Sequence, residues 1–208
     1  MDGDATIARL LEHPAIWRGR NAARQAIWSS GYAALDAQLP GGGWPRSGLI
    51  EIHARFGSGE LAVLLPLLAH LTQRVSARWC VWVAPPLLPF APGLATQGVV
   101  LERLAVVSAE QPLWSFEQVL RSGACDVALG WIKRVRPRDT RRLQLAAAHG
   151  RTLGVLFRAP GAAREPSAAQ LRLALEARAE GVRVSLLKGR TAARASVQLM
   201  PPLFEDLR

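Results

Sequence analysis

The amino-acid sequence predicts an α/β domain with a mostly parallel central sheet flanked by helices. From Leu49 onward, short β-type runs alternate with helical stretches, a pattern typical of parallel strands joined by crossover helices. Half of the residues are hydrophobic and a fifth are charged, a composition that fits a folded domain and excludes a disordered or fibrous chain. The length of 208 residues fits one domain, because independent domains usually have roughly 100–200 residues.

The predicted elements follow one another along the chain. A strand over Leu49–His53 and a Gly-containing turn lead to a helix over 60–73. Proline disfavours both helices and strand ladders, so the Pro-rich stretch 85–92 is expected to be irregular, and the Ala- and Pro-rich stretch 159–169 to be a loop. Strands over 182–188 and 195–200 flank Gly189 and predict a C-terminal antiparallel hairpin. The remaining strands are expected at 79–84, 104–107, 126–131 and 152–157, and the remaining helices at 115–121 and 138–149.

The N-terminal segment differs from the rest of the chain. Apolar residues recur at near-helical spacing and are interrupted by Pro14, which predicts a helical arm over residues 1–29, a domain over 30–200 and a tail over 201–208. The arm is a candidate partner contact, although its tryptophans could equally close the core of the domain. The candidate contact residues are Leu10, Leu11, Ile16 and Trp17.

Cysteine, histidine and hydropathy patterns exclude several kinds of site. Cys80 and Cys125 lie in apolar runs and are expected to be reduced thiols of the core. The four histidines are scattered without metal-ligand spacing, so no metal is expected. The longest apolar run, Leu61–Leu68, is far shorter than the ~20 residues of a membrane span. The N-terminus lacks the basic region of a signal peptide, and we expect a cytoplasmic protein without a membrane partner.

The chain carries a net charge of +10, which favours acidic partners such as nucleic acid. One basic cluster directly follows the predicted strand 126–131. This cluster is either a phosphate-contacting patch or the solvated start of the helix over 138–149, and the sequence leaves both interpretations open. Its members are Lys133, Arg134, Arg136, Arg138, Arg141 and Arg142.

The segment that leads into the first strand resembles the entry to the ATPase core of the RecA family. It begins with Ser30-Gly-Tyr-Ala-Ala-Leu-Asp36, continues through the three glycines 41–43, and reaches a strand that contains Glu51 and Ile52. Successive glycines permit the positive φ values of a tight turn, and Asp36 is expected where a short helix ends. The resemblance implies a RecA-like core.

The phosphate loop that should follow is degenerate. In the motif G-x-x-x-x-G-K-[ST], backbone N–H groups hold the phosphates, while Lys and Ser or Thr bind the γ-phosphate and Mg²⁺. The chain keeps only two glycines of the loop, and a carboxylate at the cation position would repel a triphosphate. No cofactor is therefore expected. The loop is marked by Ala54, Gly57, Gly59, Glu60 and Leu61.

Two further ATPase positions have lost their chemical groups. The block Ser122–Leu129 resembles a Walker-B strand, but Gly130 follows where the family has the Asp that positions Mg²⁺. Pro86 stands where RecA-like ATPases carry the Glu that activates water. The prediction is a chain without catalytic residues. An active ATPase would require Arg55, or a Lys from outside the chain, to supply the missing cation.

A RecA-type frame without its catalytic groups resembles the ImuA family of translesion DNA synthesis. The likeness rests on Trp17 and Arg18, the turn 41–46, the stretches 57–65 and 84–93, and the block 121–124. It implies a non-enzymatic adaptor of the damage-induced response that binds an ImuB-like inactive Y-family polymerase and, through it, RecA or an error-prone polymerase. The alternative is a shorter relative, the SulA cell-division inhibitor, which binds a division protein; the N-terminal arm favours ImuA.

The tail offers one more candidate contact. Leu203 and Phe204 follow Gln198 in a run that loosely resembles peptides that bind sliding clamps. Two apolar side chains near a chain end can act as anchors for a partner, but they can also pack against their own domain.

Overall fold

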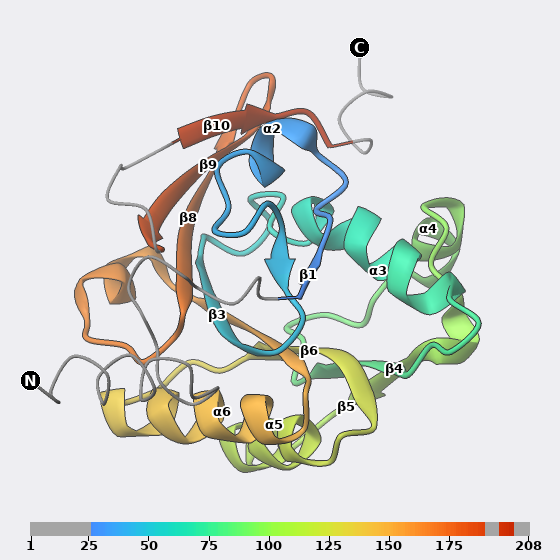
Figure 1. The fold of residues 1–208 in the computed structure, drawn as a ribbon, viewed down its shortest axis with the longest axis vertical. Coiled ribbons are helices and arrows are strands. Elements are labelled where there is room, and N and C mark those ends of the chain that lie inside the picture. Colours follow the sequence, from blue (N-terminus) through green and yellow to red (C-terminus); the bar gives the residue numbers. More distant parts are fainter. Residues whose placement is uncertain (1–25, 190–195, 202–208) are drawn as a thin grey trace, which may run out of the picture.

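The computed structural model describes residues 26–189 and 196–201, which form a central sheet with helices on both faces (Figure 1). The sheet has eight strands in the order β10-β9-β8-β3-β7-β6-β4-β5. Neighbouring strands from β8 to β5 run parallel, whereas β8 with β9 and β9 with β10 pair antiparallel. The predictions of a mostly parallel sheet and of a C-terminal antiparallel hairpin are confirmed. The strands are β3 (Gly48–His53), β4 (Trp79–Val83), β5 (Leu104–Val107), β6 (Cys125–Trp131), β7 (Leu153–Arg158), β8 (Leu171–Arg178), β9 (Gly181–Lys188) and β10 (Ser196–Leu199).

Short elements and helices complete the described part of the chain. A two-residue pairing joins Trp28 to Trp44 ahead of the sheet, and Asp36 ends the short first helix, as predicted. These elements are β1 (Ile27–Trp28), β2 (Trp44–Pro45), α2 (Ala33–Asp36), α3 (Leu65–Gln73), α4 (Ala91–Thr96), α5 (Pro112–Arg121) and α6 (Pro137–His149), with 3₁₀ turns η1 (Ala62–Leu64), η2 (Leu101–Arg103) and η3 (Pro160–Arg164).

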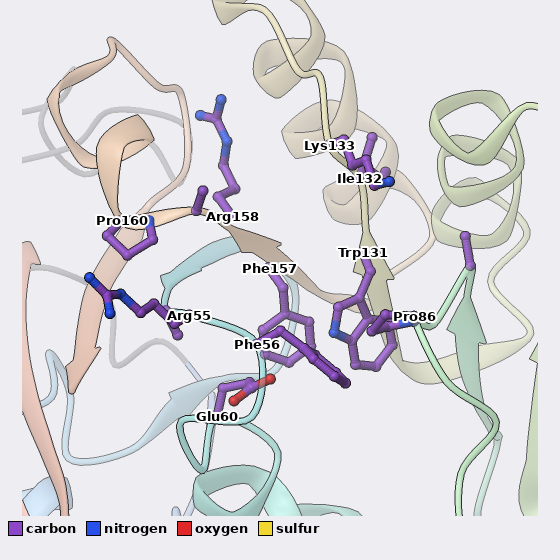
Figure 2. Close-up of a pocket in the computed structure, with 13 residues that line it drawn as sticks. Arg55, Phe56, Glu60, Pro86, Trp131, Ile132, Lys133, Phe157, Arg158 and Pro160 are labelled. Atoms are coloured by element: carbon purple, nitrogen blue, oxygen red, sulfur yellow. The ribbon is translucent and has the colours of Figure 1, made fainter. Parts of the chain in front are cut away.

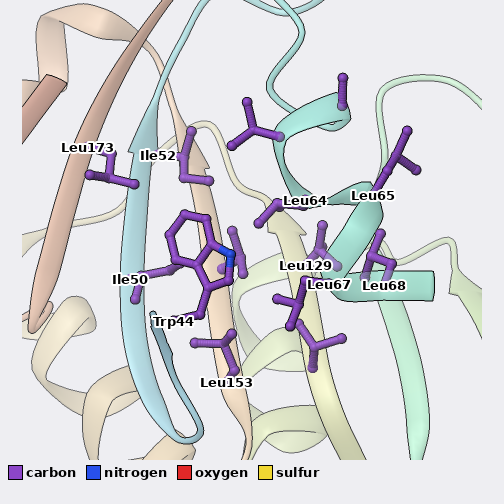
Figure 3. Packing of buried hydrophobic residues seen from close by; sticks show 14 of the residues in the cluster. Trp44, Ile50, Ile52, Leu64, Leu65, Leu67, Leu68, Leu129, Leu153 and Leu173 are labelled. Carbon is purple, nitrogen blue, oxygen red and sulfur yellow. The ribbon is translucent and has the colours of Figure 1, made fainter. Parts of the chain in front are cut away.

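Two hydrophobic clusters lie on opposite faces of the sheet. On one face α2, α3 and Trp44 pack against alternate strand residues such as Ile50 and Ile52, and Figure 3 shows Trp44 enclosed by these side chains. On the other face α5 and α6 cover the sheet, and Phe116 is fully buried there. A parallel sheet needs cover on both faces, and the alternation of side chains along each strand supplies it.

The structure differs from the predicted elements in several ways. The helix expected over 60–73 becomes 3₁₀ turn η1 followed by α3, because Pro66 lacks an N–H and fits only the first turn of an α-helix. A turn of 3₁₀ helix, η3, forms inside the expected loop 159–169. The strand β8 was not predicted at all. It forms because it pairs with both β3 and β9.

The described residues contain no helix that is both long and apolar enough to cross a membrane. Within the same ranges, no group of three or more His, Cys, Asp or Glu side chains is arranged to hold a metal ion.

Candidate functional site

The degenerate phosphate loop lies where an α/β sheet usually binds ligands. It connects the end of β3 to η1, at the carboxyl edge of the parallel strands, and ligand sites of open α/β sheets lie outside that edge. Gly57 and Gly59 have φ values of 80° and 81°, which L-residues with side chains rarely adopt. The loop therefore keeps two glycine turns although the charged groups of a phosphate loop are absent from it.

Glu60 occupies the loop with its own carboxylate. Its Oε1 atom accepts a hydrogen bond of 3.0 Å from the backbone N–H of Gly57, and the residue is only 6% exposed. A phosphate loop uses such N–H groups to hold an anion of the nucleotide. Here the anion belongs to the chain itself, so the loop amide is already satisfied.

Packing closes the position where RecA-like ATPases carry the metal-binding Asp. A Cβ atom on Gly130 would lie 2.9 Å from Cδ2 of Phe116, closer than real side chains approach one another. Phe116 is fully buried in the core. A glycine at this position is thus required by the packing of α5 on β6, and no carboxylate could replace it without moving the ring.

A cavity of 620 Å³ opens beside the loop. Phe56 comes from the loop, Trp131 from the end of β6 and Phe157 from β7; Pro86 lies beside Trp131 (Figure 2). The Trp131 and Phe157 rings stack with centroids 4.6 Å apart. The cavity is thus mostly apolar and aromatic, as binding pockets often are. Pro86 lines it without offering a proton acceptor.

A buried ionic cluster lies on the α6 side of β3, around Glu51. The Glu51 carboxylate accepts hydrogen bonds from Arg172 Nε at 2.7 Å and from Ser167 Oγ at 2.7 Å, and His53 Nε2 lies 3.1 Å from it. Arg158 Nη1 adds an ion pair at 3.5 Å. Burial alone would raise the pKa of Glu51, but the hydrogen bonds from His53 and Ser167 and the positive charge of Arg172 outweigh it and lower the pKa to about 2. The carboxylate stays ionised and holds β3, β7 and β8 together.

The Walker-B-like block serves a structural purpose in this chain. Asp126 is 3% exposed and forms ion pairs with Arg74 at 3.3 Å and with Arg78 at 3.0 Å. Arg78 also donates to the backbone carbonyl of Gly123. The acidic residue of the motif therefore fixes the start of β6. Cys80 and Cys125 are free and buried, as predicted.

The basic cluster is exposed, but only part of it is unpaired. Lys133, Arg134 and Arg136 lie between β6 and α6, and the other three residues lie on α6. Arg142 forms an ion pair with Glu117. Binding of nucleic acid by Lys133, Arg134, Arg136, Arg138, Arg141 and Arg142 stays a prediction.

The two other predicted contact groups cannot be placed in the fold. Leu10, Leu11, Ile16 and Trp17 of the arm lie outside the described residues, as do Leu203 and Phe204 of the tail. Both groups remain predictions.

The sequence analysis missed the Glu51 cluster and the aromatic walls of the cavity. A signal for the cluster was present, because Glu51 and His53 interrupt an otherwise apolar strand and Arg172 alternates with leucines. The cavity walls come from four separate segments, and no local pattern marks them.

Comparison with known proteins identifies relatives of the chain. The family model described as "Cell division inhibitor SulA" matches residues 55–154. The SulA protein of Photorhabdus laumondii is 34% identical over 113 residues, which cover 53% of this chain and 63% of that protein. The SulA protein of Edwardsiella piscicida is 32% identical over 119 residues, 54% of this chain and 69% of that protein. A crystal structure of SulA from Pseudomonas aeruginosa is similar with a TM-score of 0.45 and 24% identity, over 53% of this chain and 97% of that one.

These matches correct the assignment to the ImuA family. With that assignment, the function in translesion synthesis and the ImuB-like, RecA and polymerase partners are overturned as well. The features that suggested ImuA were a degenerate RecA-type loop and strand, which the alternative family was expected to share. The arm that favoured ImuA lies outside the matched residues. The match spans less than two thirds of the Photorhabdus relative.

The expectation that the chain is not an enzyme agrees with the matching family, whose description names an inhibitor. The similarity to the Edwardsiella relative extends over more than two thirds of its length. The chain belongs to the SulA family of cell division inhibitors.

Proposed function

We propose that the chain inhibits cell division in the DNA-damage response by binding the division protein FtsZ. The observation that carries the proposal is the family match over residues 55–154, a segment that runs from the degenerate loop to β7. This segment contains β4, β5, β6 and the start of β7, together with the helices α3 to α6. We infer that the inhibitory surface lies on these elements. FtsZ as partner would place the chain in the cytoplasm.

The geometry of the loop supports inhibition by binding rather than by turnover. Glu60 satisfies the Gly57 amide, and Phe116 closes the metal position at Gly130. A protein with this loop has no route to couple its action to nucleotide hydrolysis. The degree of inhibition would then depend on how much of the chain is bound to the division protein.

The details of the core support descent from a RecA-type frame. A short helix ends at Asp36, and Gly41 and Gly42 have φ values of 83° and 84° in the turn that follows. The strand β3 then leads directly into the glycine loop. We infer that the SulA-type inhibitor keeps the RecA-type order of these elements and uses the sheet as a scaffold.

One exposed apolar group in the matched segment fits a protein partner. Leu87, Leu88 and Phe90 are 68%, 82% and 75% exposed, and all three lie in the connection between β4 and α4. Neighbouring exposed apolar side chains of this size are uncommon on a monomer surface unless they bind something. We propose this connection as the contact with FtsZ.

The proposal is tested by expressing the chain in bacteria and measuring cell length. We expect long filaments with normally segregated DNA from the wild-type chain. Leu88→Ser should lose most of the filamentation, because it removes an exposed apolar contact without disturbing the core. Normal cell length with a soluble, folded wild-type chain would contradict the proposal.

Leu145→Ser is the matched control for this experiment. Leu145 is 62% exposed on α6, so its replacement changes surface hydropathy to the same degree at a place outside the proposed contact. Filamentation by Leu145→Ser should equal that of the wild type. Equal loss in both variants would show that the connection after β4 is not the contact.

A further inference from the structure

The cavity beside the degenerate loop contains a buried acceptor that nothing in the described part of the chain satisfies. Glu60 lines the cavity and is 6% exposed, and its Oε2 atom has no hydrogen-bond partner within residues 26–189 and 196–201. Leaving a buried carboxyl oxygen unpaired costs free energy that a hydrogen-bond donor would recover. The site therefore favours a ligand that brings a donor.

A donor of the same cavity is also unsatisfied. The Nε1 atom of Trp131 is buried and, among the described residues, has no acceptor. Figure 2 shows the Trp131 ring and the Glu60 carboxylate on either side of Phe56. A hydroxyl group both donates and accepts, so one hydroxyl of a ligand offers what each of these atoms lacks.

The cavity walls favour an aromatic ring on that ligand. Phe56, Trp131, Phe157 and Pro86 supply flat apolar surfaces, and aromatic pairs in offset or tilted geometry gain about 0.5–1.5 kcal/mol beyond burial. Phe56 is 62% exposed and next to Gly57, where space for a Cβ is open. Because most of the Phe56 side chain is exposed, its ring has room to move and to cover a ring that enters.

The rim of the cavity is cationic. Arg55 and Lys133 line the cavity and are exposed, and in the part of the chain that the structure describes neither has a side-chain partner. Figure 2 shows them at opposite sides of the opening. Arg134 and Arg136 continue the positive charge beyond Lys133. Because this charge extends past the cavity, it fits a chain of acidic residues better than a single small anion.

We propose that this cavity binds a tyrosine side chain presented by an acidic peptide segment of another protein. The tyrosine ring displaces the exposed Phe56 ring and packs against Trp131, its hydroxyl then reaches Glu60 Oε2 and donates to it, and acidic residues on both sides of the tyrosine meet Arg55 and Lys133. The site goes beyond the proposed contact with FtsZ, since it uses the cavity and none of Leu87, Leu88 and Phe90, although Pro86 of the same connection lines it.

Fluorescence anisotropy with labelled peptides tests the proposal. The probe is a peptide with a central tyrosine between acidic residues, and the comparison peptides replace the tyrosine by phenylalanine or alanine at unchanged charge. We expect saturable binding of the tyrosine peptide, binding of the phenylalanine peptide that is about threefold to tenfold weaker, and binding of the alanine peptide that is at least about tenfold weaker. Equal binding of the tyrosine and alanine peptides would overturn the proposal, because charge alone would then explain the affinity.

Variants of the chain distinguish the contribution of the rim residues to peptide binding from that of the overall positive charge. Lys133→Glu should weaken binding of the tyrosine peptide at least about fivefold. The control Arg103→Glu makes the same charge change at an exposed position of η2 and should leave binding within about twofold of the wild type. Equal losses in both variants would contradict the proposed site, as would displacement of the peptide by ATP at comparable concentration. The assay contains no division protein, so its result is independent of the test of inhibition.

Discussion

Glu60 Oε1 accepts a hydrogen bond from the backbone N–H of Gly57 at 3.0 Å. This bond places a carboxylate of the chain where a phosphate loop would hold an anion of the nucleotide. We therefore predict that the loop binds no nucleotide although its two glycines keep positive φ values. The amide that could hold an anion is thus occupied by an internal contact.

We predict that restoring the Lys and Thr residues of the phosphate-loop motif does not restore ATP hydrolysis. The double variant Glu60→Lys/Leu61→Thr returns the cation and the hydroxyl, but Gly130 and Pro86 still lack the metal carboxylate and the base. Phosphate release with Mg-ATP should therefore equal the background of the wild-type chain. An active RecA-type ATPase serves as positive control, and steady turnover by the wild type or the double variant would contradict this account.

The contact between Gly130 and Phe116 makes a quantitative prediction of stability. Gly130→Ala should lower the free energy of unfolding by about 1–3 kcal/mol, because the new methyl group overpacks the core against the Phe116 ring. Adding Phe116→Leu should cost less in the Gly130→Ala background than in the wild type, since the smaller side chain relieves the clash. Urea unfolding of the four proteins measures this coupling, and strictly additive losses would refute it.

The Glu51 cluster predicts a loss of stability in acid. The pKa of Glu51 is about 2 in the folded chain against an ordinary value of 4.5. A lowered folded pKa gives stability that is fully present above pH 4.5 and is lost as the pH falls toward 2. The contribution is about 3 kcal/mol. Urea unfolding between pH 7 and pH 2.5 should show this decline.

Glu51→Gln should remove most of that decline and lower stability at pH 7 by about 3–5 kcal/mol, because Arg172 would then be buried without its anion and Arg158 would keep only Glu165. The control Glu176→Gln changes an exposed ion pair with Arg178 and should alter stability by at most about 0.5 kcal/mol. A flat pH profile in the wild type would show that the cluster does not stabilise the fold as described.

The two cysteines should be unreactive in the folded chain. Burial raises the pKa of the Cys80 thiol to about 12 and that of Cys125 to about 11, and the thiol form is a poor nucleophile. Labelling by a chromogenic disulfide reagent at pH 8 should therefore follow global unfolding, with both thiols reacting at once in denaturant. Rapid labelling of the native chain would contradict the buried position of these strands.

Local sequence patterns predicted most strands of the sheet. They failed for β8, which is a strand because it pairs with its neighbours in the sheet. The runs around Ile50, Val81 and Val155 combine apolar side chains with flanking turns, and their positions agree with β3, β4 and β7. The segment Leu171–Arg178 consists of Leu, Ala, Glu and Arg, which also favour helices. It becomes β8 because Arg172 meets Glu51 and because both neighbouring strands accept its backbone.

The sequence predicted which ATPase residues the candidate site lacks, but it did not predict which residues of the site contact one another. The missing cation at Glu60 and the missing acid at Gly130 can be read from single positions. The bond from Gly57 to Glu60, and the cavity between Phe56 and Trp131, depend on how separate segments approach one another. The family assignment failed for a related reason: the degenerate loop was expected in both candidate families, whereas the SulA family is identified by similarity over more than half of the chain.

Sedimentation of FtsZ polymers in the presence of GTP tests the central claim most directly. Adding the purified chain in increasing amounts should lower the polymer pellet in proportion to the chain added, without ATP, and a titration should reach full inhibition near a fixed ratio of the two proteins. An undiminished pellet in the presence of an excess of folded chain would contradict the account.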